Sequence, residues 1–120
     1  MELHTIRPSA VVARNKLVAL TTTSATPIVT VPVGLTGLYR VGVYGIVQTA
    51  ATTVTVSVTY TDPTTGSQQT LTPINGVSEP VGPFTVAVTV AAQGGTAISV
   101  TVTAGTANQV TVSAAVEALP

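Results

Sequence analysis

Side chains that could do chemistry are few in this chain and widely spaced. Its 120 residues contain 4 acidic side chains, and those after the N-terminal segment are Asp62, Glu79 and Glu117. In glycosidases two carboxyl groups must flank one cleft at roughly 5 to 9.5 Å, and aromatic residues commonly hold the sugar. Residues 62–66 (DPTTG) are typical of a turn, which accounts for Asp62, and nothing places Asp62 beside Glu79. We therefore expect no catalytic residues and a protein that is not an enzyme.

The chain also has few residues that could form a metal or cofactor site. His4 is the only histidine, and the chain has no cysteine, which excludes both a thiolate metal site and a disulfide framework. A site at His4 would need ligands from other subunits. Gly94 and Gly95 are followed by neither a lysine nor a helix start, so they do not resemble a phosphate-binding loop. We expect no metal ion and no cofactor.

Charge and hydropathy exclude two further classes of partner. Lys plus Arg number 4 and the formal net charge is +0, which is too little positive charge to neutralise a track of phosphates. No uncharged apolar run approaches the roughly 18 residues that a membrane span needs. Residues 1–16 also lack the apolar centre of a secretory signal. We expect neither nucleic acid nor a membrane as a partner.

The distribution of threonine and valine predicts the elements that must position any site. The chain has 24 Thr and 22 Val, and branching at Cβ favours strands. From residue 17 onward apolar and polar residues alternate, with turn-forming residues every 8 to 12 positions or so. This pattern predicts an all-β fold, an antiparallel β-sandwich of jelly-roll type. The expected strands cover about 17–20, 27–33, 38–48, 53–61, 67–72, 84–92, 97–104 and 109–119, and 73–83 is expected to be a long loop.

The two faces of these strands predict a core and an unusual surface. The side chains expected to be most buried are Val56, Val58, Val86, Val88, Val100, Val102 and Val112. The opposite faces carry Thr, Ser and Ala, whereas isolated sandwiches normally place charges there. A neutral surface of this kind tends to associate, so we expect much of it to be covered by copies of the chain or by a partner. The alternative is a weakly charged monomer.

The first sixteen residues differ in composition from the rest. They contain Arg7, Arg14 and Lys16, three of the 4 basic residues, and Pro8 blocks a helix. We expect residues 1–16 to form an extended N-terminal arm and residues 17–120 to form the sandwich. An arm that orders on binding could dock on a partner. The expected docking residues are Leu3, Ile6, Arg7, Pro8, Val11, Arg14 and Lys16. The alternatives are a frayed terminus or a strand that pairs with the protein's own sheet.

Residues 37–47 (GLYRVGVYGIV) carry a family resemblance. A turn glycine followed by an apolar residue, a tyrosine and an alternating strand is similar to the equivalent strand of complement-type and tumour-necrosis-factor-type jelly rolls, which are trimers. With the closing residues 115–119 (AVEAL), the span 17–119 resembles small Thr- and Val-rich structural proteins of tailed bacteriophages. The resemblance implies a homotrimeric jelly roll on the virion surface, assembled in the host cytoplasm. It would act as a capsid decoration (cement) or head-fibre protein.

Under this resemblance the partners are other copies of the chain and the major capsid protein or another virion protein. Alternation places Arg40, Tyr44 and Ile46 on one face of their strand, and an arginine between tyrosine and glycine is unusual in a dry core. We therefore expect these three residues at the subunit interface; alternatively Tyr44 is an ordinary half-buried aromatic and Arg40 is solvated. Two other functions stay open: a receptor- or carbohydrate-binding adhesin module of a phage tail, and a cell-surface or immunoglobulin-like spacer.

Overall fold

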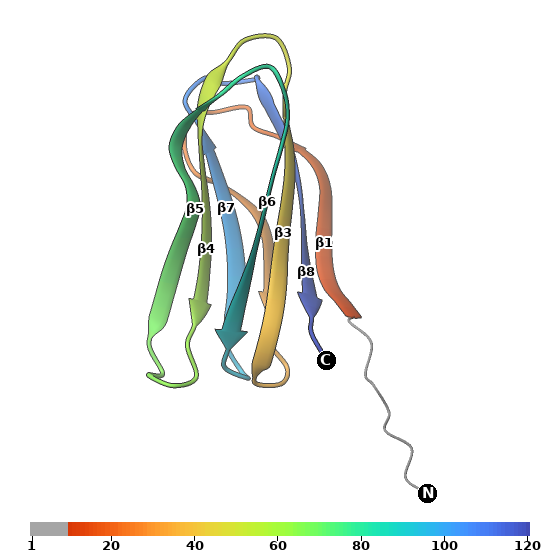
Figure 1. Ribbon diagram of the computed structural model, residues 1–120, viewed down its shortest axis with the longest axis vertical. Coiled ribbons are helices and arrows are strands. Elements are labelled where there is room, and N and C mark those ends of the chain that lie inside the picture. The colour runs from red at the N-terminus through yellow and green to blue at the C-terminus, as the bar shows by residue number, and fades with distance from the viewer. Residues whose placement is uncertain (1–9) are drawn as a thin grey trace, which may run out of the picture.

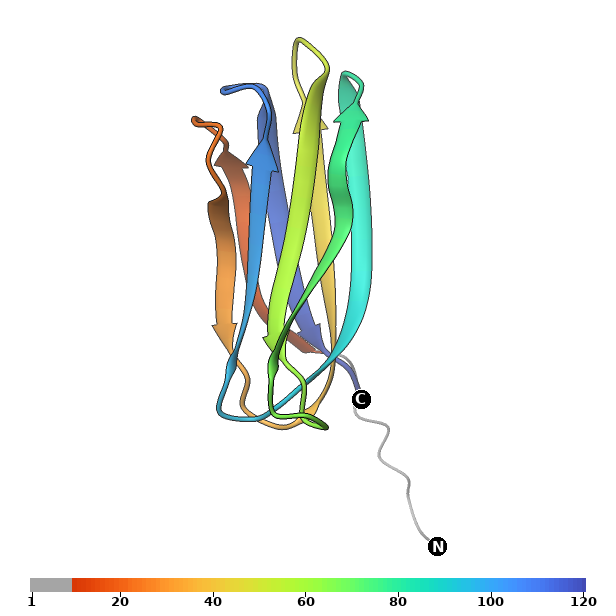
Figure 2. The ribbon, with the colours of Figure 1, turned by 90° about the vertical axis from the view of Figure 1, so that its left-hand side faces the viewer.

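Two four-stranded antiparallel sheets face one another across a core of aliphatic side chains (Figure 1, Figure 2). The computed structural model describes residues 10–120, and within them it contains no helix. The strands are β1 (Ala10–Ala19), β2 (Thr26–Pro32), β3 (Gly37–Val47), β4 (Thr52–Thr61), β5 (Gln68–Glu79), β6 (Gly82–Ala92), β7 (Ala97–Ala104) and β8 (Val110–Ala118).

The order of the strands defines a jelly roll. One sheet has the order β1-β8-β3-β6 and the other β2-β7-β4-β5. The chain therefore changes sheet at every connection except the β4–β5 hairpin and pairs early strands with late ones. The predicted all-β antiparallel sandwich of jelly-roll type is confirmed.

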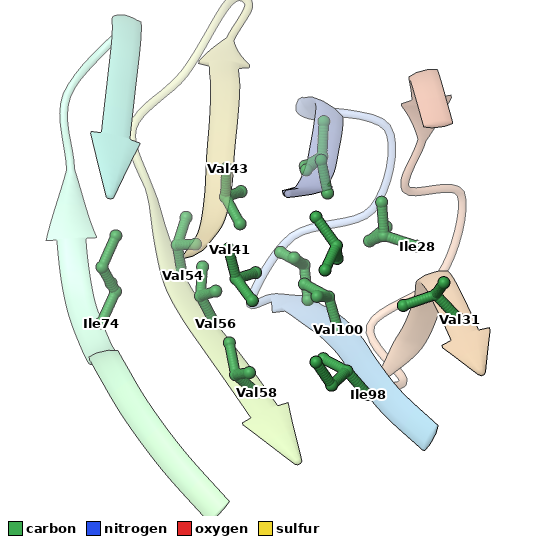
Figure 3. Close-up of a cluster of buried hydrophobic side chains, with 14 of the residues drawn as sticks. Ile28, Val31, Val41, Val43, Val54, Val56, Val58, Ile74, Ile98 and Val100 are labelled. Carbon is green, nitrogen blue, oxygen red and sulfur yellow. The ribbon is translucent and has the colours of Figure 1, made fainter. Parts of the chain in front are cut away.

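The alternating sequence of β4 shows why these residues form strands. Val54, Val56 and Val58 are at most 1% exposed, while the threonines and serine between them point outward. In Figure 3 these valines meet Val41 and Val43 of β3 across the core. A strand that buries every second side chain against a facing sheet gains hydrophobic stabilisation along its whole length.

Most of the predicted core lies where the alternation placed it. Val56, Val58, Val100, Val102 and Val112 are all at most 1% exposed. The prediction is wrong for the remaining two valines, Val86 and Val88, which are only half-buried. Both lie on β6, an edge strand with a neighbour on one side only, so the core covers them less completely.

The N-terminal boundary differs from the one expected. Strand β1 begins at Ala10 and pairs with β8, from Ala10 opposite Ala118 to Ala19 opposite Thr111. Residues 10–16 therefore belong to the sheet, and the expected arm of residues 1–16 is wrong for this part. The physical reason is that the outer side of β8 offers backbone groups that an adjacent extended segment satisfies. Residues 1–9 lie outside the described residues, including the expected docking residues Leu3, Ile6, Arg7 and Pro8.

The expected loop over 73–83 is also wrong in most of its length. Strand β5 continues to Glu79 and contains two irregularities in its pairing with β4, where Val54, Val56 and Val58 are opposite Val77, Ile74 and Leu71. Gly76 lies in one of them with a φ of 62°, and its N–H donates to Thr55 Oγ1 at 2.9 Å. An edge strand tolerates proline and positive-φ glycine at such bulges, because its outer backbone groups need no ladder partner.

Candidate functional site

The charged side chains of residues 10–120 are not gathered into a catalytic site. Asp62 accepts hydrogen bonds from the Thr64 N–H and the Thr65 hydroxyl, both at 3.2 Å, and so closes the β4–β5 turn as expected. Glu79 is opposite Thr52, at the other end of the same hairpin. No cluster of three His, Cys, Asp or Glu side chains that could hold a metal ion occurs in this part of the chain. Nor does any helix there have the length and apolar character needed to span a membrane.

The outward face of β3 carries several exposed apolar side chains. Inward residues such as Tyr39 and Val41 are at most 5% exposed, and the Tyr39 hydroxyl donates to the Leu35 carbonyl at 2.6 Å. On the outward face, large apolar side chains are 36–52% exposed. We call the outward residues the β3 patch: Leu38, Arg40, Tyr44 and Ile46.

Small side chains surround the β3 patch on both neighbouring strands. Tyr44 lies between Ser113 of β8 and Thr85 of β6, and the glycine two positions earlier lies between Ala115 and Ala87. Tyr44 therefore has small residues beside it on the outward face, including Gly42, Ala87 and Ala115. An exposed apolar patch on a polar surface is typical of an interaction site.

The only charged member of the patch is paired. Arg40 lies opposite Glu117 of β8, and its Nη2 is 2.6 Å from Glu117 Oε1, while its Nε donates to the same oxygen at 2.7 Å. Both side chains stay partly exposed, at 49% and 27%. The pair leaves the β3 patch without net charge. Sequence reasoning placed Arg40 on this face and missed Glu117, because their pairing depends on the register between two distant strands.

The outer face of the other sheet carries hydroxyl groups. Thr30, Ser99, Thr59 and Thr70 are successive neighbours across all four strands. The hydroxyl oxygens of Thr30 and Ser99 lie 3.4 Å apart, and those of Thr59 and Thr70 lie 3.3 Å apart. Hydroxyl pairs of this kind stabilise a sheet without charge. This row of side chains across the sheet is therefore polar and uncharged, as the composition predicts.

The expected site residues fall into two separate groups. Arg40, Tyr44 and Ile46 come together on the β3 patch. The expected docking residues that the structure describes lie on β1, where Val11 is 57% exposed and Arg14 is opposite Ala115. Lys16 falls within the second pairing irregularity of this strand.

Comparison with known proteins identifies the fold. No family model and no curated protein matches the sequence. The structure is similar to the xylan-binding CBM22-1 domain of Paenibacillus barcinonensis Xyn10C, at a TM-score of 0.53 and 9% identity, over 96% of this chain and 98% of that domain. It is similar to the zebrafish complement 1qA globular domain, at a TM-score of 0.51 and 10% identity, over 92% of this chain and 95% of that one.

A third similar structure is a viral one. The VP2 subviral particle protein of infectious bursal disease virus matches at a TM-score of 0.52 and 12% identity, over 92% of this chain and 32% of that protein. This chain thus spans about a third of the length of VP2. The three similar structures are jelly-roll-like domains, and the likeness establishes the fold.

Proposed function

We propose that this chain is a non-enzymatic structural protein of a virion, a capsid decoration or head-fibre subunit that assembles with copies of itself and docks on a shell. The observation that carries the proposal is the β3 patch, a group of exposed apolar side chains beside one paired arginine. Covering a face of this kind removes apolar area from water, and its one arginine already has a carboxylate partner. The fold that the chain shares with VP2 supports the proposal.

The β3 patch is the proposed subunit interface, in a homotrimer. Tyr44 and Ile46 supply apolar area, and aromatic residues are common in the centre of interfaces. Arg40 and Glu117 would form the polar rim, where a charge pair contributes orientation more than affinity. The outward threonines of β6 and β8 could pack their methyl groups against a second copy and hydrogen-bond to it through their hydroxyls, which suits a permanent contact.

Docking on the shell is assigned to the N-terminal segment. Every basic residue other than the paired Arg40 lies in residues 1–16. The described part of this segment is the first part of β1, which begins at the end of the sandwich where Ala10 is opposite Ala118 (Figure 1). A basic, partly apolar segment at one end of an otherwise neutral body complements an acidic groove, and the proposed partner is the major capsid protein or another virion protein.

A carbohydrate-binding adhesin is the second candidate, favoured by the fold shared with a xylan-binding domain. Sugar recognition commonly relies on exposed aromatic side chains that stack on the ring. The chain has no Trp, 3 Tyr and 1 Phe. Of these, Tyr39 and Phe84 are at most 7% exposed and only Tyr44 is 47% exposed. One exposed tyrosine is a small platform for a glycan, so the structural function is favoured.

A binding experiment separates the two functions. The purified protein is mixed with emptied capsids of tailed phages and sedimented, and it is applied in parallel to a glycan array. The structural function predicts that the protein sediments with capsids and leaves the array unlabelled. Labelling of glycans without sedimentation would overturn it in favour of the adhesin. A monomer that binds neither would overturn it as well.

A further inference from the structure

The two sheets leave four edge strands, and three of them are protected. An edge strand exposes unpaired N–H and C=O groups, and proteins commonly block it with bulges, prolines or charges. Strands β1 and β5 each contain two irregularities in register, and β2 contains one. The sequences of these strands also contain prolines or charged residues, namely Arg14 and Lys16 in β1, Pro27 and Pro32 in β2, and Pro73 in β5.

Strand β6 has only one of these devices, a proline near its start. It pairs with β3 without a register shift, from Gly82 opposite Val47 to Ala92 opposite Gly37. Its 11 residues include no charged side chain, and its one proline is the second residue. A long, regular and uncharged edge is a template for pairing with another strand.

The hydrogen bonds around β3 establish which residues of β6 face the free edge. On the β8 side, Gln48 N–H donates to the Gln109 carbonyl and the Leu38 carbonyl accepts from Leu119 N–H. Even-numbered residues of β3 therefore direct their backbone groups to β8, and odd-numbered ones direct theirs to β6. The β6 partners of those odd-numbered residues are even-numbered. The remaining residues direct their backbone groups to the free edge, and four of them are exposed: Pro83, which has no N–H, and Thr85, Ala87 and Thr89.

The sequence of this edge is self-complementary. Residues 85–89 (TVAVT) read the same in both directions about Ala87. In an antiparallel pair centred on Ala87, Thr85 of one copy is opposite Thr89 of the other, and Val86 is opposite Val88. In this register the residues whose backbone groups face the free edge are opposite one another. The N–H and C=O groups of the two Ala87 residues therefore hydrogen-bond to each other.

We propose that β6 is a second self-assembly surface, which pairs antiparallel with β6 of a second copy about a two-fold axis at Ala87. The pairing joins the two β1-β8-β3-β6 sheets into one continuous sheet. It also covers Val86 and Val88, which a single copy leaves half-buried. Strand β5 contacts β6 at the same side of the sandwich, and its Leu71 and Val77 are 37% and 47% exposed, so the apolar area beside the edge is larger than β6 alone.

This surface adjoins the β3 patch, because Thr85 and Ala87 of β6 are opposite Tyr44 and Gly42 of β3, but the two use different groups. The patch lies on the outward face of the sheet, whereas the proposed pairing uses backbone groups in the plane of the sheet. The inference therefore goes beyond the proposed function and does not rest on it. A variant of Tyr44 is expected to leave the β6 pairing intact.

Single cysteines test the register directly, because the chain has none of its own. In Ala87→Cys the two-fold axis brings the two Cα atoms to about 5.5 Å. That distance lies within the usual range of roughly 4.4 to 6.8 Å for disulfides. Thr89→Cys is the matched control on the same strand and face, because its two copies would be separated by roughly 13 Å, four residues of strand.

After mild oxidation of folded protein, we expect a covalent dimer from Ala87→Cys and at least tenfold less from Thr89→Cys. The double variant Thr85→Cys/Thr89→Cys should again give the dimer, since these positions are opposite one another. Equal cross-linking of the two single variants, or none from Ala87→Cys while its circular dichroism stays that of the parent, would overturn the proposal.

Charge complementation gives an independent measurement. Ala87→Lys and Ala87→Glu each place like charges opposite one another at the two-fold axis, which opposes pairing. Each variant alone should therefore lose the β6 contact in light scattering, and a one-to-one mixture should regain it. A mixture that assembles no better than either variant alone would overturn the proposal.

Discussion

The ring of Phe84 lies directly over Gly45, its register partner on the neighbouring strand β3. A Cβ added at Gly45 would overlap ring atoms of Phe84, including Cζ and both Cε atoms. Phe84 is 7% exposed, so the missing side chain of Gly45 is what allows this ring into the core. The backbone of Gly45 is not in the left-handed region, and the requirement is therefore one of space alone.

Replacing Gly45 with alanine should destabilise the fold by about 1 to 3 kcal/mol, the usual cost of overpacking a core. Urea unfolding measures this change. Gly42→Ala is the matched control on the same strand, because nothing lies within 4 Å of a Cβ there. Adding Phe84→Leu to Gly45→Ala should recover part of the loss, as contacting residues couple in a double-mutant cycle. Equal effects of the Gly45 and Gly42 changes would contradict the assigned contact.

The two faces of β7 should differ in their response to truncation. Val100 is fully buried, and Val100→Ala should cost about 1 to 3 kcal/mol through lost transfer energy and a cavity. Its neighbour Thr101 is half-buried on the outward face, and Thr101→Ala should cost less than about 1 kcal/mol. Thermal or urea unfolding of the two variants tests this. Equal costs would indicate that the outer face of this sheet is also covered in the assembly.

Replacing Tyr44 with aspartate should break the proposed trimer, because burying an unpaired carboxylate costs more than the roughly 2 to 7 kcal/mol of an unbonded neutral polar group. Light scattering measures the change in mass. Thr30→Asp adds the same charge to the outer face of the other sheet and should leave the assembly intact. A parent protein that scatters as a 12.0 kDa monomer at micromolar concentration would contradict the trimer itself.

Removal of residues 1–9 should abolish docking on capsids while leaving the thermal stability of the sandwich unchanged. Removal of residues 1–16 should also lower the stability, because it takes away most of the pairing between β1 and β8. Sedimentation with capsids and thermal unfolding measure the two effects separately. Docking of the parent should weaken as salt is raised, since screening reduces the attraction of its basic residues. Full occupancy by the shorter truncation would show that the contact lies elsewhere.

Sequence reasoning predicted the strands best where the alternation is regular. The span expected for β4, residues 53–61, differs from the observed Thr52–Thr61 by one residue at its start. It failed at β5, where Pro73 and Gly76 indicated a loop. These residues are tolerated because β5 is an edge, and edge position depends on the whole topology rather than on local sequence.

The N-terminal error and the missed partner of Arg40 have a related cause. Charged residues before position 17 indicated a separate arm, yet a strand needs only a neighbour with free backbone groups, and β8 provides one. Arg40 and Glu117 are likewise brought together by the register of β3 with β8. The sequence near a strand does not specify which distant strand pairs with it. Composition and periodicity therefore could not predict the pairing of β1 with β8 or the contact of Arg40 with Glu117.

The position of Ala10 opposite Ala118 gives the sandwich a polarity, with both described chain ends at the same pole (Figure 2). Two copies joined through antiparallel β6 strands would have these poles at opposite extremities. The start of β1 would then lie at each extremity. Such a dimer could lie along a shell and connect two neighbouring docking sites. A single copy attached through its N-terminal segment would instead project from the shell. The proposed β6 contact would therefore determine whether the protein reinforces the shell or projects from its surface.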